Sequence, residues 1–251
     1  MKAIFCIGAS HIMALRDGYS VRAAARMAGG FAWKEIATPR HMKAHRHVIT
    51  EAIDAEYAAI VSTADVSEIF LCCGGGEHVG ISLFNNRPFE VYMPDDDPQQ
   101  EISRDCDIIP YDVLLATCAF HVLEPVPFVQ RIRSLSSLPM YHILPPPPPV
   151  AQDWARDRVP PAFRDMVDKF GFAPAPRRHK VWHLCCTAAR QIYQDMGISV
   201  IEPPAEAMDE RGFLAPQYAG VDLVHANEAY GALVVDRMVS IAANHASRAL
   251  E

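Results

Sequence analysis

The chain has 251 residues, half of them apolar, with 21% charged and 9% aromatic side chains. This composition excludes a disordered chain, and the length suits one domain with a sizeable core, so we expect residues 1–251 to form a single domain. The formal net charge of -7 argues against a general nucleic-acid-binding protein, which needs a basic surplus. No apolar run reaches the roughly 18 residues that cross a bilayer, and residues 1–10 lack the long apolar segment of a signal peptide. We therefore expect a cytoplasmic protein without a membrane partner.

Short apolar runs and longer helical patterns alternate along the chain. The runs predict buried strands at residues 3–7, 68–73, 140–144 and 198–201, and the last three end in clusters of glycine or proline. Apolar spacing predicts helices at residues 51–61, 111–135 with a break near Pro125 and Pro127, 177–196, and 230–243. Such alternation indicates a parallel sheet with helices on both faces, a three-layer α/β sandwich. The acidic stretch 95–97 and the proline-rich segment 145–176 are expected to be long surface loops.

Seven cysteines stand at positions 6, 72, 73, 106, 118, 185 and 186. Their number is odd and no Cys-x-x-Cys occurs, which fits neither a disulfide framework nor a zinc site. We interpret them as small buried thiols in a reducing compartment. His179 and His183 could share a helix face, but the basic residues around them disfavour a metal ion, and the histidines at 41, 45 and 47 are interpreted as a solvated segment. No metal and no cofactor is expected.

Two polar clusters flank the predicted sheet near the two ends of the chain. Ser10 follows the first strand, where a rigidly held hydroxyl can act as a nucleophile; the alternative is a helix N-cap. Asp222 and His225 form an Asp-x-x-His pattern, in which the carboxylate can reach Nδ1 of the imidazole; the alternative is again an N-cap aspartate. The terminal Leu250 and Glu251 are compatible with a cloning scar.

A glycine run follows the second predicted strand, as Gly74, Gly75 and Gly76 before Glu77 and His78. Glycines at such a place let backbone N–H groups approach a ligand closely. The known phosphate-binding glycine patterns are absent, so an oxyanion site or a tight turn remains.

In their order and setting these clusters resemble the SGNH, or GDSL-type, hydrolases. Residues 8–11 are similar to the first block of that family, residues 74–77 to the third block, Gly-x-Asn-Asp, and residues 222–225 to the last block, Asp-x-x-His. The resemblance implies a flavodoxin-like α/β sandwich in which Ser10 is the nucleophile, His225 the general base and acid, and Asp222 its orienting carboxylate. The α/β-hydrolase fold is disfavoured, because no Gly-x-Ser-x-Gly elbow is present.

The chain departs from the family pattern at two positions. Ala9 replaces the first-block aspartate, and Gly76 replaces the asparagine whose amide helps to bind the oxyanion. Losing one oxyanion donor typically costs about 10²–10³ in rate. We expect oxyanion or substrate binding by Gly74, Gly75, Gly76, His78 and His11, with Asn85 and Asn86 as further substitute donors and Gly29 or Gly30 as the second-block glycine.

The resemblance implies a serine esterase that hydrolyses a small acyl ester. Two alternatives remain open. One is a weak or inactive protein of the same fold that binds a small acylated or carbohydrate ligand, which the residues at positions 9 and 76 favour. The other is an acyltransferase, in which an alcohol replaces water as the acceptor. The oligomeric state stays open.

Overall fold

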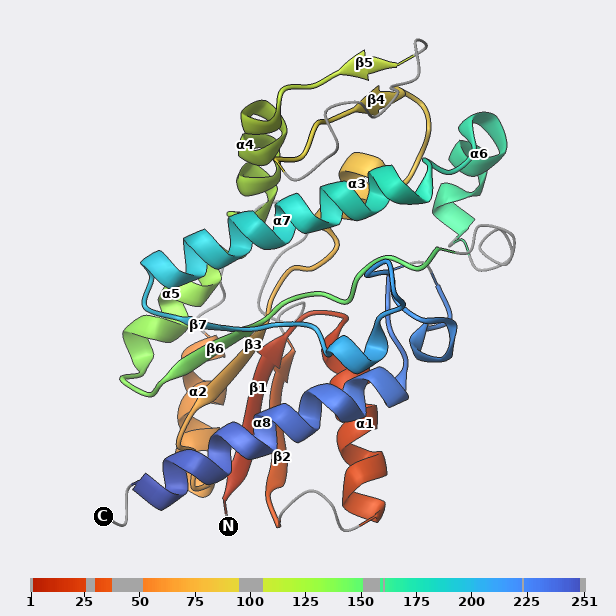
Figure 1. Cartoon of the computed structure of the whole chain (residues 1–251). Coiled ribbons are helices and arrows are strands. Elements are labelled where there is room, and N and C mark those ends of the chain that lie inside the picture. The colour runs from red at the N-terminus through yellow and green to blue at the C-terminus, as the bar shows by residue number, and fades with distance from the viewer. Residues whose placement is uncertain are drawn as a thin grey trace.

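A five-stranded sheet lies at the centre of the computed structural model, which describes residues 2–25, 30–37, 52–94, 106–150, 159, 161–222 and 224–248. Its strands are β1 Ala3–Gly8, β2 Ala32–Ala37, β3 Ile69–Cys72, β6 Met140–Ile143 and β7 Ser199–Ile201. Every neighbouring pair is parallel, in the order β2-β1-β3-β6-β7 (Figure 1). This is the flavodoxin-like order of doubly wound sheets, with the reversal of winding direction at β1 and β3.

Helices cover both faces of this sheet, because successive strand residues point to opposite sides. Phe5 and Ile7 face one core, and Ile4 and Cys6 face the other. The first core is covered by α2 Ala52–Thr63, α4 Tyr111–Val122, α5 Val126–Leu135 and α7 Ala175–Asp195. The second is covered by α1 Ile12–Ala24 and α8 Glu228–Arg248. The predicted three-layer α/β sandwich with a mainly parallel sheet is therefore confirmed.

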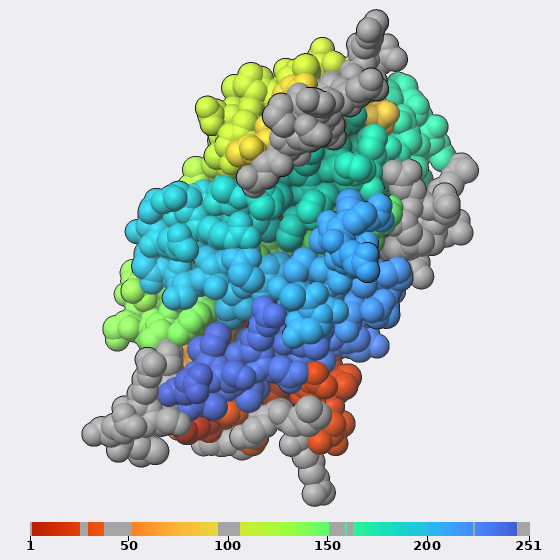
Figure 2. All heavy atoms as spheres, in the orientation of Figure 1, coloured from red at the N-terminus to blue at the C-terminus, as the bar shows by residue number. Residues whose placement is uncertain are grey.

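The packing of α1 against α8 brings the two ends of the chain together. A Cβ added to Gly231 would lie 1.8 Å from the carbonyl oxygen of Ala14, and one added to Gly18 would lie 2.3 Å from the backbone nitrogen of Ala232. Glycines at these positions let the two helix backbones approach closely. Figure 1 shows the N-terminal part of the blue α8 crossing the red α1, and Figure 2 shows the atoms of the two chain ends in contact on the surface. Residues just before α1 thus come close to residues just before α8.

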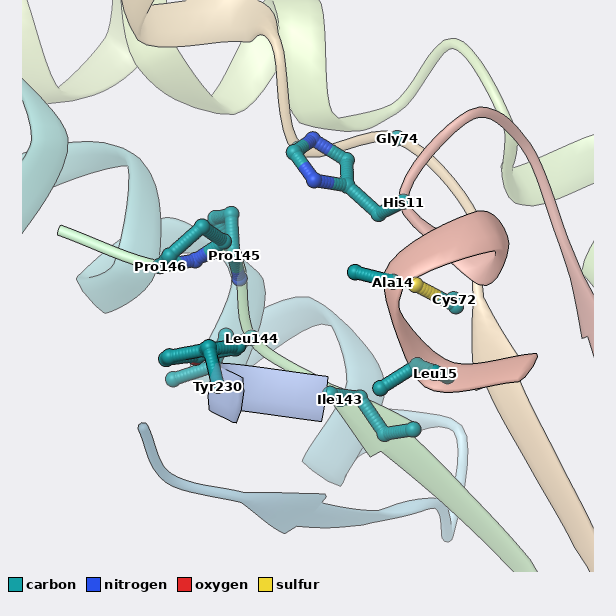
Figure 3. Close-up of a pocket in the computed structure, with 11 residues that line it drawn as sticks. His11, Ala14, Leu15, Cys72, Gly74, Ile143, Leu144, Pro145, Pro146 and Tyr230 are labelled. Atoms are coloured by element: carbon teal, nitrogen blue, oxygen red, sulfur yellow. The ribbon is translucent and has the colours of Figure 1, made fainter. Parts of the chain in front are cut away.

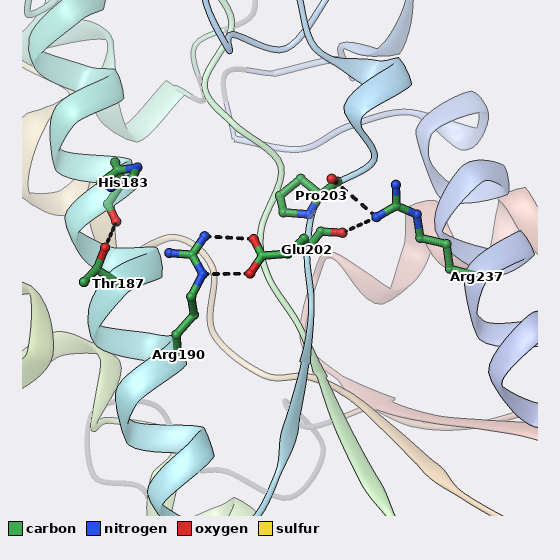
Figure 4. Close-up of polar contacts among 6 residues, drawn as sticks. All are labelled: His183, Thr187, Arg190, Glu202, Pro203 and Arg237. Carbon is green, nitrogen blue, oxygen red and sulfur yellow. Dashed lines mark hydrogen bonds and ion pairs between the residues drawn. The ribbon is translucent and has the colours of Figure 1, made fainter. Parts of the chain in front are cut away.

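A polar cluster at the end of β7 joins the two helical layers (Figure 4). The Glu202 carboxylate accepts two hydrogen bonds from the Arg190 guanidinium, at 2.7 and 2.8 Å. The backbone carbonyl of Glu202 accepts a third, at 2.9 Å, from Arg237 on α8. The C-terminal edge of the sheet is therefore fixed from both sides.

The helices and strands with few buried residues were not predicted from the sequence. The predicted strands and helices agree with the observed ones within a few residues, except that α8 extends to Arg248. However, α1 and the edge strand β2 were not predicted. In β2 only Ile36 is buried, so this strand has no apolar run. The short α3 Glu77–Ser82, and β4 Phe89–Glu90 paired with β5 Asp107–Ile108, were also missed.

The prediction of a surface loop over residues 145–176 is wrong. The segment contains α6 Pro161–Phe170 and the start of α7, because proline is well tolerated in the first turn of a helix. Prolines 146–149 are buried. Side chains donate hydrogen bonds to two backbone carbonyl groups of this proline run. Trp182 donates to the Pro145 carbonyl, and Arg178 donates to the Pro149 carbonyl. Two 3-10 helices, Ala205–Ala207 and Pro216–Tyr218, follow β7. The other predicted surface loop, residues 95–97, lies outside the described residues.

The cysteines are all free thiols, six of them buried and Cys106 half-buried. In the described part of the chain no single helix has the length and apolar character needed to cross a membrane, although the bent pair α4 and α5 passes that test jointly.

Candidate active site

Ser10 lies on the turn between β1 and α1, at the C-terminal edge of the sheet. The backbone enters this turn under tight constraint, because the Ala9 N–H donates to the Cys72 carbonyl at 3.0 Å and a Cβ on Gly8 would lie 2.7 Å from that same oxygen. The Ser10 side chain is exposed. The hydroxyl is thus held on a fixed backbone and open to a ligand.

The structure brings Ser10, His225 and Asp222 into one hydrogen-bonded line. Ser10 Oγ lies 2.8 Å from His225 Nε2, and His225 Nδ1 lies 2.7 Å from Asp222 Oδ2. An ionised carboxylate only accepts hydrogen bonds, so the neutral imidazole carries its proton on Nδ1. The Nε2 lone pair is then free to accept the hydrogen of the Ser10 hydroxyl, as a general base must.

Asp222 is fixed by its own loop. Its Oδ1 accepts the backbone N–H groups of Val224, at 2.9 Å, and of His225, at 2.8 Å. Burial would raise the pKa of Asp222, but the hydrogen bonds from the His225 ring and these two N–H groups outweigh it and lower the pKa to about 2. The carboxylate therefore stays ionised at neutral pH.

Neither the hydroxyl nor the carboxylate acts as a helix N-cap. The N-cap of α1 is His11, without a side-chain hydrogen bond, and the Ser10 hydroxyl faces His225 instead. Helix α8 is capped by Asn227, whose Oδ1 accepts the N–H groups of Ala229 and Tyr230. The N-cap alternatives for Ser10 and Asp222 are therefore wrong.

The glycine run forms a tight turn after β3. Gly74 has φ 86° and Gly75 has φ 106°, both in the left-handed region that side chains rarely adopt. The Gly75 N–H donates to both carboxylate oxygens of Glu77, at 2.9 and 2.7 Å. This N–H is thus engaged within the chain and not free to bind an oxyanion. Gly76 is exposed and ends the turn as the N-cap of α3.

Two buried imidazoles lie against this turn. Burial, with smaller effects of His225 and His78, lowers the pKa of His11 to about 3. Burial and the nearby Arg178 guanidinium lower the pKa of His78 to about 4. Both rings are neutral at physiological pH, and the ring centroids of His11 and His225 are 4.8 Å apart.

The backbone N–H of Ser10 has no acceptor among the residues that the structure describes, so it is available as an oxyanion donor. Among the described residues, the asparagines expected to act as substitute oxyanion donors do not reach Ser10. The Asn85 side chain accepts a hydrogen bond from Arg177, and no contact joins Asn85 or Asn86 to Ser10. Gly30 has φ 77° with nothing within 4 Å of an added Cβ, whereas Gly29 and the histidines at 41, 45 and 47 lie outside the described residues.

An open groove runs past the Ser10 hydroxyl between the start of α1 and the loop before α8. Apolar side chains of Met13, Ala14 and Val221 line it, together with the carboxylates of Asp17 and Glu228. A second, smaller cavity of ≈ 20 Å³ lies on the other side of Ala14, beneath His11 (Figure 3). It has room for about one water molecule, and the buried Tyr230 hydroxyl, which finds no partner among the described residues, lines it.

Sequence reasoning missed two residues that shape the site. Glu77 was noted only as part of a block, yet it accepts the Gly75 N–H. Gly220 donates its N–H to the His225 carbonyl at 2.8 Å, and a Cβ there would lie 2.4 Å from that oxygen. A glycine two residues before an Asp-x-x-His pattern was the available signal. His179 proves structural, since its Nε2 lies 3.1 Å from the Gly212 carbonyl oxygen.

No protein-family model and no curated protein matches this sequence. Among solved structures the chain is similar to an aryl esterase of M. smegmatis, with 11% identity over 98% of this chain and 99% of the other, at a TM-score of 0.49. It is also similar to a carbohydrate acetylesterase family member from Sinorhizobium meliloti, with 14% identity over 96% and 100%, at 0.49. A third is a GDSL-like lipase from Bacteroides thetaiotaomicron, with 11% identity over 98% and 89%, at 0.47.

Proposed function

We propose that this chain is a serine esterase of SGNH type that hydrolyses small acyl esters through Ser10, His225 and Asp222. The observation that supports it most is the line from Ser10 Oγ to His225 Nε2, at 2.8 Å, and from His225 Nδ1 to Asp222 Oδ2, at 2.7 Å. The three groups come from opposite ends of the chain, and a serine, a correctly oriented imidazole and an ionised carboxylate suit nucleophilic acyl transfer.

In the proposed reaction, Ser10 Oγ attacks the ester carbonyl while His225 Nε2 takes the hydroxyl proton. Asp222 stabilises the imidazolium that forms, and the Ser10 N–H donates to the oxyanion. His225 then returns the proton to the leaving alcohol. Water repeats the sequence on the acyl-enzyme, with His225 again as the base, and frees Ser10.

A second candidate is a protein of the same fold that binds an acylated or carbohydrate ligand without turnover. Two observations favour it: position 76 has no side chain, and the Gly75 N–H is bound to Glu77. An acyltransferase would use the same three residues with an alcohol acceptor.

Covalent labelling with a fluorophosphonate probe separates these candidates. The wild-type chain is expected to label at Ser10, and Ser10→Ala should abolish the label. A matched serine control is Ser20→Ala on α1, where the hydroxyl donates to the Arg16 carbonyl, and it should label normally. A folded wild-type protein that neither labels nor hydrolyses p-nitrophenyl acetate would favour the binding protein. Transfer of the acyl group to added alcohols in preference to water would favour the acyltransferase.

A further inference from the structure

The carboxylate of Glu77 binds the glycine turn, although Glu77 is not one of the three residues of the proposed triad. Glu77 is the first residue of α3, and its side chain turns back to accept the Gly75 N–H on both oxygens. A charge-assisted hydrogen bond of this kind is about twice as strong as a neutral one. Glu77 thus fixes the orientation of the Gly75 peptide.

Gly75 is held between Glu77 and His11. A Cβ on Gly74 would lie 2.3 Å from Glu77 Oε1, and a Cβ on Gly75 would lie 2.8 Å from both Cδ2 and Nε2 of His11. Both contacts are closer than a side chain allows. Movement of the turn away from Glu77 would therefore change the packing of His11.

His11 connects the turn to the catalytic base. It follows Ser10 directly, is buried, and packs its ring against that of His225 at an interplanar angle of 47°. Figure 3 shows the His11 side chain beside Gly74 at one end of the smaller cavity, with Leu15 and Ile143 at the other. A continuous series of contacts thus runs from Glu77 through Gly75 and His11 to His225.

We propose that Glu77 is a positioning residue for the proposed esterase: its ionised carboxylate holds Gly75 against His11, and His11 in turn holds the His225 ring in line with Ser10. This inference rests on the proposed function. Glu77 does not touch the reacting atoms and acts only through its neighbours.

The surroundings of Glu77 make its charge sensitive to pH. Burial raises the pKa of Glu77, an effect that its hydrogen bonds only partly oppose. Other titratable groups face it from α4, α7 and the two strands that border it: His121, Glu124, Cys118, Cys185, Cys186, Tyr193, Cys73 and His142. Among these groups His121 lowers the pKa of Glu77 and Glu124 raises it, and burial has the largest effect.

The test compares Glu77→Gln with Glu206→Gln, a matched control at an exposed glutamate near Arg237. Glu77→Gln should lower kcat for p-nitrophenyl acetate about tenfold at neutral pH with KM nearly unchanged, since a displaced base affects the chemical step. The ratio of wild-type to Glu77→Gln activity should fall toward one as the pH is lowered, because wild-type Glu77 becomes neutral as well. A constant ratio across pH, or no loss of kcat, would overturn the inference.

A double-mutant cycle tests the path through His11. In a His11→Ala background, Glu77→Gln should cost little further activity, because the intermediate contact is already lost. Additive losses would overturn the path. Circular dichroism shows whether Glu77→Gln folds. If it does not, the pH profile of kcat is measured for His11→Ala alone. This variant should lack the part of the loss of kcat at low pH that protonation of Glu77 causes.

Nuclear magnetic resonance of the imidazole nitrogens separates failure of this inference from failure of the proposed function. Glu77→Gln should shift the ring signals of His11 and His225, and Glu206→Gln should not. If the wild-type protein neither labels nor hydrolyses esters but these signals shift, only the proposed function fails. If the protein labels and the signals do not move, only the role of Glu77 fails.

Discussion

Asp222→Asn is the most informative perturbation of the proposed triad, because it preserves the shape of the side chain and reverses one hydrogen bond. The asparagine Oδ1 can still accept the N–H groups of Val224 and His225, so the loop should keep its conformation. The amide that replaces Oδ2, however, donates to His225 Nδ1. The imidazole proton then moves to Nε2, where it faces the Ser10 hydroxyl and prevents the ring from acting as a base.

The expected loss can be worked out from the same contacts. The pKa of Asp222 falls from 3.8 to about 2, which corresponds to about 2 kcal/mol of preference for the ionised carboxylate at this place. The hydrogen bond to the His225 ring is one of the causes of this preference. The wrong tautomer leaves Ser10 without a base, so kcat should fall by about 10⁴, the effect of this substitution in a serine protease triad.

The assay is steady-state hydrolysis of p-nitrophenyl acetate, with thermal melting as the measure of folding. KM and the melting temperature of Asp222→Asn should stay near the wild-type values. Asp222→Ala should lose as much activity and also melt lower, because two backbone N–H groups lose their acceptor. If Asp222→Asn keeps more than about a tenth of the activity, Asp222 does not orient His225 and the reasoning fails.

Three further predictions concern the turn, the helix crossing and a buried histidine. Gly76→Asn has open space for its side chain and an ordinary φ of -98°, and should raise kcat by about 10²–10³ by supplying the missing oxyanion donor. Gly231→Ala places a methyl group 1.8 Å from the Ala14 oxygen and should lower the free energy of unfolding in urea by about 1–3 kcal/mol, with a loss of activity. His142→Phe, which keeps the stacking on Tyr193, should gain about 3 kcal/mol of stability at pH 4.5 relative to its effect at pH 7.

The sign of the last effect follows from burial. Burial lowers the pKa of His142 to about 3, whereas an unfolded histidine titrates near 6.5, so the wild-type protein loses stability as the pH falls from about 6.5 toward 3. The same substitution at exposed His183 should leave this dependence unchanged. A stability of His142→Phe that follows the wild type across pH would contradict the assignment. An unchanged kcat in Gly76→Asn, or an unchanged unfolding transition in Gly231→Ala, would contradict the other two.

The sequence predicted the elements that are buried on both sides and missed those that are not. Residues 3–7 are a continuous apolar run, and residues 140–144 are apolar except for the buried His142, because β1 and β6 lie inside the sheet with helices on both faces. By contrast β2 is an edge strand with one buried residue, and α1 buries only Ile12, Leu15 and Gly18. No periodicity in residues 12–24 or 32–37 distinguishes such elements from loops.

In the candidate site, the sequence spacing predicted the contact between Asp222 and His225, whereas the contact between Ser10 and His225 depends on the chain topology. Asp222 and His225 are three residues apart, so their contact is a property of one loop. The meeting of Ser10 with His225 depends on the close crossing of α1 and α8, which requires Gly18 and Gly231. The link between Gly75 and Glu77 could not be predicted, because it depends on the left-handed φ of both glycines before α3.

The proposed mechanism has two parts, proton transfer and oxyanion binding, and the structure supports them unequally. The groups proposed to move protons form a complete hydrogen-bonded line, whereas the proposed oxyanion site lacks the amide side chain at position 76. A serine triad contributes about 10⁶ to kcat in the best-studied case, and one lost oxyanion donor costs about 10²–10³. The difference leaves an acceleration of about 10³–10⁴, so the proposed enzyme should be slow but measurable on activated esters. Because Gly76→Asn acts on the oxyanion and Asp222→Asn on the base, their effects on kcat should multiply, and strong departure from that product would show that the turn and the base are coupled through His11.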